Sequence, residues 1–61
     1  MSFTPEQVAR GILTTIARGD WSLAVARLKA AKHSTKVNAL VVKGLTSDEQ
    51  KTWARYTERK S

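Results

Sequence analysis

The chain has 61 residues with no Cys and one His, so it has no disulfides and too few ligands for a structural zinc site. Lys and Arg number 11 against 5 for Asp and Glu, and the resulting charge of +6 favours acidic partners. A chain this short buries only about 60% of the surface that its unfolded form exposes. We therefore expect a single small helical domain over residues 1–61 that gains burial from good helix packing, a partner or, as we favour, a homodimer.

The first predicted helix covers residues 5–18. Thr4 and Gln7 have the spacing of a capping box, with a Pro at the first helical position. Phe3 and Val8 occupy the two positions of a hydrophobic staple, which gives Phe3 a place in the core. One apolar face follows at helical spacing, made of Val8, Ala9, Ile12, Leu13, Ile16 and Ala17.

Two glycines belong to this region. Gly11 lies beside the apolar face, where it is either tolerated at a cost of about 1 kcal/mol relative to Ala or required for the close approach of another helix. Gly19 stands where a left-handed helix terminator is expected, and Asp20 can cap the next helix at once.

The second predicted helix covers residues 21–33. Trp21, Val25 and Leu28 form its main apolar stripe, and Trp21 is expected in the core. Much of its remaining surface is alanine, which permits short distances to a neighbouring helix. We expect a turn around Ser34 and Thr35.

The segment 36–43 leaves two alternatives open. Val37, Leu40 and Val41 share a helical face, and Gly44 follows as a terminator. The segment is also rich enough in β-branched residues for a strand, which would need a partner strand from a second copy. We favour a helix.

The last predicted helix covers residues 47–59. Thr46 and Glu49 form a second capping box, with acids in the first turn opposing the helix dipole. This helix is weakly amphipathic, so it is either a lid pinned by Trp53 or a basic, aromatic arm. Together the segments predict an all-α fold, a compact bundle of three to four short helices.

The residues that could support catalysis have structural explanations. Four of the five acids are expected as caps or first-turn charges, namely Glu6, Asp20, Asp48 and Glu49. His33 and Ser34 are adjacent, but adjacency makes no catalytic triad, and no phosphate-binding glycine loop is present. We therefore expect no enzyme, no cofactor, no metal and no small-molecule substrate.

Positive charge concentrates in the middle of the chain, because no acid occurs between Asp20 and Asp48. The plain interpretation is a solvated face with cations near helix C-termini. The functional interpretation is a nucleic-acid-binding patch. A helix-turn-helix comparison is possible, although this turn lacks the glycine often found there. The candidate nucleic-acid-binding residues are Arg27, Lys29, Lys32, Lys36 and Lys43.

The sequence thus favours a small basic regulatory protein that engages nucleic acid or a nucleoprotein. The alternative is an inhibitor or adaptor that binds another protein through its aromatic-basic C-terminal helix. The residues of that surface would be Trp53, Arg55, Tyr56 and Arg59. The chain has no run of about 20 apolar residues and no secretion signal at its start, so we expect no membrane partner and a cytoplasmic location.

Overall fold

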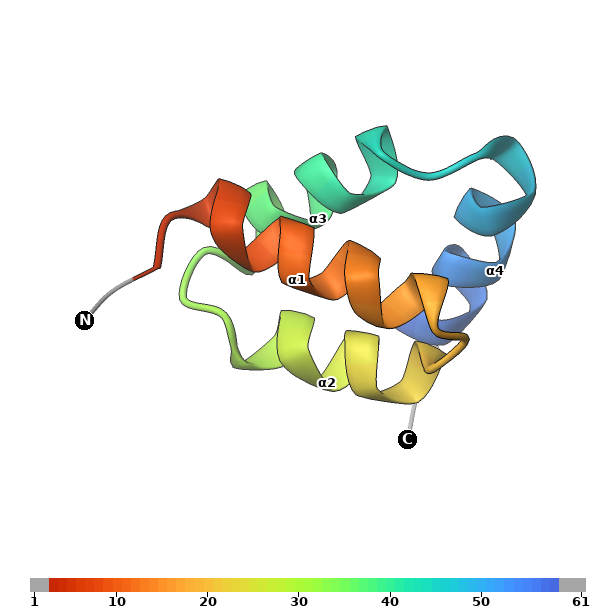
Figure 1. Cartoon of the computed structure of the whole chain (residues 1–61), viewed down its shortest axis with the longest axis horizontal. Helices are drawn as coiled ribbons and strands as arrows, with labels where there is room; N and C mark the ends of the chain where they lie inside the picture. Colours follow the sequence, from red (N-terminus) through yellow and green to blue (C-terminus); the bar gives the residue numbers. More distant parts are fainter. Residues whose placement is uncertain (1–2, 59–61) are drawn as a thin grey trace.

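The computed structural model describes residues 3–58, which form four helices and no strand. The helix α1 lies between α2 and α3, and α4 packs at the end of the bundle where α1 ends and α2 begins (Figure 1). The all-α prediction is confirmed, and residues 36–43 are helical. The helices are α1 (Pro5–Ala17), α2 (Trp21–Ala30), α3 (Ser34–Lys43) and α4 (Ser47–Thr57).

Both predicted capping boxes are present. The Oγ1 of Thr4 accepts the backbone N–H of Gln7 at 3.2 Å, and the Gln7 Oε1 accepts the N–H of Thr4 at 3.1 Å. Thr46 and Glu49 repeat the arrangement at 3.3 and 2.9 Å. These reciprocal bonds satisfy N–H groups that a helix start otherwise leaves without partners, so they fix where α1 and α4 begin.

The turn between α1 and α2 also has the two features predicted from the sequence. Gly19 has a φ of +85°, in the left-handed region that residues with a Cβ adopt at a cost. Asp20 then caps α2, its Oδ1 accepting the N–H of Leu23 at 3.2 Å. The chain reverses over the three residues 18–20, so α2 folds back along α1.

The predicted boundary between the second and third helices was wrong. Helix α2 ends at Ala30 rather than at residue 33, and Ser34 is already helical. The turn is Ala31 to His33, and Ala31 is extended with a ψ of 140°. The reason is packing: the turn at residues 31–33 lets α3 lie against α1, where Val37 and Val41 are fully buried in the core. Gly44 ends α3 as expected, but with a φ of −90° rather than a left-handed one.

All four helices contribute buried residues to the core. Ala9, Ile12 and Ile16 are buried as predicted, whereas Ala17 is exposed. Phe3 does not close a staple onto the core: its side chain is 73% exposed, so its predicted core role was wrong. The buried hydrophobic residues are Ala9, Ile12, Ile16, Ala24, Val25, Leu28, Val37, Val41, Leu45 and Trp53.

Helix α4 is a lid held by aromatic packing, as one of the two interpretations predicted. The ring of Trp21 stacks on Tyr56, with centroids 5.8 Å apart and planes at 12°, and lies 6.3 Å from the ring of Trp53. Gln50 joins the N-terminal part of α4 to the end of α3, because its Nε2 donates to the carbonyls of Val42 and Leu45 at 3.0 and 3.1 Å. These carbonyls lie at the end of α3 and just after it, so Gln50 also caps α3.

Candidate nucleic-acid interface

All five cations proposed for nucleic-acid binding are exposed, but the fold does not gather them in one place. Lys29 lies at the end of α2, Lys32 in the turn and Lys36 in the first turn of α3. We call these three residues the turn cluster. Lys29 lines one open hollow together with Ser34 and Thr35, and Lys32 and Lys36 line a second hollow that includes the same two residues.

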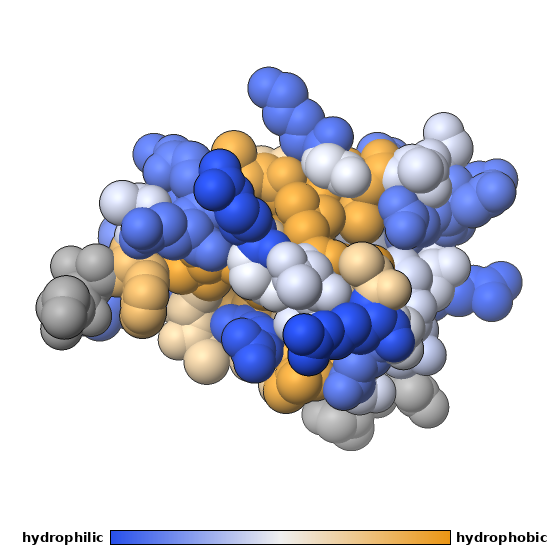
Figure 2. Space-filling model, in the orientation of Figure 1, coloured by the Kyte–Doolittle hydropathy of each residue, from blue (hydrophilic) through white to orange (hydrophobic). Residues whose placement is uncertain are grey.

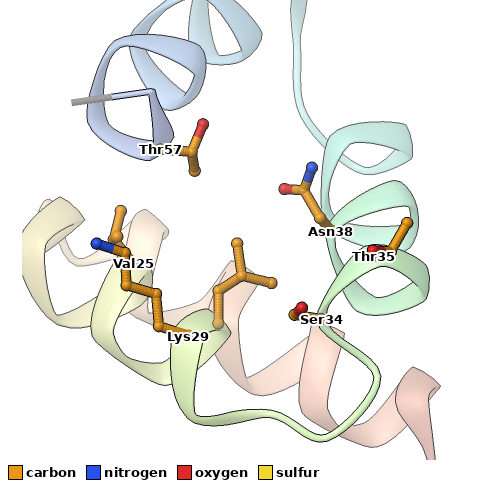
Figure 3. Close-up of a pocket in the computed structure, with 7 residues that line it drawn as sticks. Val25, Lys29, Ser34, Thr35, Asn38 and Thr57 are labelled. Atoms are coloured by element: carbon orange, nitrogen blue, oxygen red, sulfur yellow. The ribbon is translucent and has the colours of Figure 1, made fainter. Parts of the chain in front are cut away.

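The first hollow, of about 350 Å³, lies between α2, α3 and the end of α4. Lys29 from α2, Asn38 from α3 and Thr57 from α4 surround it on three sides (Figure 3). Its apolar wall is Val25 and Leu28. The Thr57 hydroxyl already donates to the carbonyl of Trp53 at 3.0 Å. The hydroxyls of Ser34 and Thr35, the amide nitrogen of Asn38 and the ammonium of Lys29 can donate hydrogen bonds to an anion that enters from solvent.

The second hollow lies directly beside the first and carries the other two lysines. Lys32 and Lys36 line it together with His33 and Ala39. It also lies at the positive end of α3, where His33 is the N-cap residue but makes no side-chain capping bond. The N–H groups of this first turn therefore add to the positive potential of the lysines around it.

Arg27 belongs to a different surface. It lies two residues before Lys29, which places the two side chains about 200° apart around α2. Arg27 lines a hollow between α1 and α2 that shares no residue with the hollow of Lys29. The structure thus separates Arg27 from the cations with which it had been grouped.

Lys43 lies at the far end of α3. It follows Lys36 by seven residues, which is about 10 Å along the helix and nearly the same side of it. Lys36, Ala39 and Lys43 are all exposed. This face of α3 therefore extends the turn cluster along the helix.

The predicted protein-binding surface on the C-terminal helix does not form as expected. Trp53 is 1% exposed, and Tyr56 is half-buried against Trp21, so both rings are occupied inside the fold. Their positions correct the hypothesis that they are anchors for a partner. Arg55 is exposed, and Arg59 lies outside the described residues.

The sequence interpretation missed the polar residues around the turn cluster. Ser34 and Thr35 had been taken as turn residues, yet they are the first residues of α3 and line both hollows. Asn38 and Thr57 come from two helices that are far apart in the sequence. The serine and threonine beside three lysines were the available signal, since hydroxyls often accompany cations in phosphate contacts.

Two other kinds of site find no support in the described residues. Between residues 3 and 58, no three His, Cys, Asp or Glu side chains come together as ligands for a metal ion. Over the same residues, no helix has the length and apolar character needed to cross a membrane.

The chain matches no protein-family model, and no curated protein or solved structure is similar enough to count as a match.

Proposed function

We propose that this chain is a small, non-enzymatic regulatory protein that binds nucleic acid, or nucleic acid within a nucleoprotein, through the turn cluster. The observation that carries the proposal is that exposed Lys29, Lys32 and Lys36 line two adjoining hollows, both of which include Ser34 and Thr35. The cluster lies in a stretch without acids, from residue 21 to residue 47. The absence of Cys fits a reducing compartment, and we propose that the protein acts in the cytoplasm.

The chemistry of the cluster suits the phosphate backbone more than the bases. Lysine ammonium groups attract phosphates as point charges, and each contact releases condensed counterions. The hydroxyls of Ser34 and Thr35 can donate to phosphate oxygens and fix the register. Lys36 and Lys43 would continue these contacts along the exposed face of α3. Such binding depends weakly on base sequence.

The test is a titration of fluorescently labelled duplex DNA with the whole protein at several salt concentrations. Three phosphate contacts predict a slope of log affinity against log salt of about −2.7, and a fourth through Lys43 makes it about −3.6. An affinity weaker than about 10⁻⁴ M in moderate salt lies below ordinary non-specific binding and contradicts the proposal.

A matched pair of variants places the contacts. Lys36→Ala should lower the magnitude of the slope by about 0.9 and weaken binding to all sequences alike. Lys51→Ala removes an exposed cation from α4, which lies outside the turn cluster, and should leave the slope unchanged. Equal effects of the two changes would show that only net charge matters.

A further inference from the structure

A second surface with a different chemistry lies between α1 and α2. Two open hollows of about 430 and 630 Å³ share Phe3, Val8, Ala30 and Ala31 among their lining residues. Because they share these residues, the two hollows adjoin, and we call the surface that they form together the Phe3 groove. It begins at the start of α1, where Figure 2 shows hydrophobic residues at the surface.

Phe3 is the residue of this groove that most strongly indicates a binding partner. Its ring is 73% exposed, although Val8 lies at the spacing that would allow a staple. Leaving an aromatic ring in water forfeits about 1.5–3 kcal/mol of burial, and aromatic rings dominate the energetics of protein interfaces. Ala30 and Ala31 opposite are small, so the main chain of an incoming segment can approach closely.

The charges along the groove restrict what can occupy it. Arg27 lines one hollow, and Lys32 and His33 line the other. No Asp or Glu is among the described residues that line either hollow. An apolar floor with a basic rim is complementary to an apolar stripe flanked by carboxylates. A second copy of this chain, with a net charge of +6, is a poor match by the same criterion.

We propose that the Phe3 groove binds an amphipathic, acidic helical segment of another protein. Apolar side chains at positions i, i+3 or i+4, and i+7 of that segment would pack between Phe3 and the Ala30–Ala31 side. A carboxylate at its edge would pair with the guanidinium of Arg27, whose planar fork suits bidentate contacts. The groove shares Lys32 with the turn cluster, whereas Phe3, Arg27 and Ala30 lie outside that cluster.

The experiment is a selection from random peptides of about 15 residues, or about four helical turns, displayed on phage. Peptides are selected on the wild-type protein and counter-selected on Phe3→Ser. We expect the selected peptides to carry apolar residues at helical spacing together with Asp and Glu. A synthetic copy of a selected peptide should bind the Phe3→Ser variant at least about tenfold more weakly than the wild-type protein, as expected for the loss of an aromatic anchor.

Two further variants test the charge and the shape of the site. Arg27→Glu should weaken binding of the selected acidic peptide. The same variant should bind more tightly a copy of that peptide in which Lys replaces each Glu. Ala30→Gln fills the groove from the opposite side and should also weaken binding. The matched control is Leu23→Ser, because Leu23 is a second large exposed hydrophobic residue, at 43%, and lines neither hollow. Helical circular dichroism verifies that each variant folds.

Four results would overturn the proposal. In the first, no selected peptide binds the wild type better than it binds Phe3→Ser; in the second, the selected peptides carry no acids. In the third, Leu23→Ser weakens peptide binding as much as Phe3→Ser does. In the fourth, sedimentation shows a homodimer that Phe3→Ser converts to a monomer. The last result would place a second copy in the groove. Lys36→Ala should leave peptide binding intact, so failure of the nucleic-acid proposal and failure of this one are distinguishable.

Discussion

The indole Nε1 of Trp53 donates a hydrogen bond to the Oδ1 of Asn38 at 2.6 Å, and this bond joins α4 to α3. Trp53 is buried in the core, so its N–H has no access to bulk water. Asn38 lies half-buried at the edge of the first hollow and supplies the acceptor. The pair therefore allows a large aromatic ring to fill the centre of a very small domain without an unsatisfied polar group.

Replacing Asn38 by Leu should lower the free energy of unfolding by about 1–3 kcal/mol, because it leaves the buried indole N–H without a partner. Urea unfolding followed by circular dichroism measures the loss. The same change in a Trp53→Phe background removes no hydrogen bond and should cost clearly less. Equal costs in the two backgrounds would mean that the bond contributes nothing to stability.

The helix caps give a second prediction. Thr4→Ala and Thr46→Ala should each lower the free energy of unfolding by about 1 kcal/mol, since each removes the acceptor of a capping box. Thr14→Ala is the control, because Thr14 is exposed in the last turn of α1, away from the caps, and Ala is the better helix former there. Thermal unfolding of the three variants should therefore rank Thr14→Ala as the most stable.

Two glycines of the first hairpin should respond to Ala in opposite directions. A Cβ at Gly11 meets no atom within 4 Å, so the close approach of another helix is not its role, and Gly11→Ala should stabilise α1 by up to about 1 kcal/mol. Gly19 has a φ of +85°, and Gly19→Ala should destabilise by about 1 kcal/mol or more. Chemical denaturation measures the free energy of unfolding of the two variants. Changes of the same sign in both variants would contradict this account.

The parts of the fold that were predictable are those that local chemistry decides. Caps at Thr4, Asp20 and Thr46 depend on side chains three residues from their partners, so the sequence contains both members of each bond. The end of α2 depends on where α3 must lie to bury Val37 and Val41. Ala30 and Ala31 are good helix formers, and nothing local ends the helix between them.

The candidate site was predictable in composition and not in arrangement. An acid-free stretch with five cations is visible in the sequence, but its division into the turn cluster, Lys43 and Arg27 depends on helical rotation and on the position of the turn. A staple between Phe3 and Val8 was possible by spacing, yet spacing does not decide whether a ring is covered. The homodimer and the nucleic-acid partner stay predictions, because neither follows from the geometry of a single chain.

The division of the cations leads to the last prediction, which compares two neighbours on α2. Lys29 and Arg27 are both exposed, both lie near the C-terminal end of α2 and contribute equally to net charge. If nucleic acid binds the turn cluster, Lys29→Ala should lower the magnitude of the salt slope by about 0.9, whereas Arg27→Ala should leave it unchanged because its side chain lies on the other side of the helix. DNA titrations at several salt concentrations measure both slopes. Equal decreases would show that a diffuse positive field, rather than the turn cluster, holds the nucleic acid.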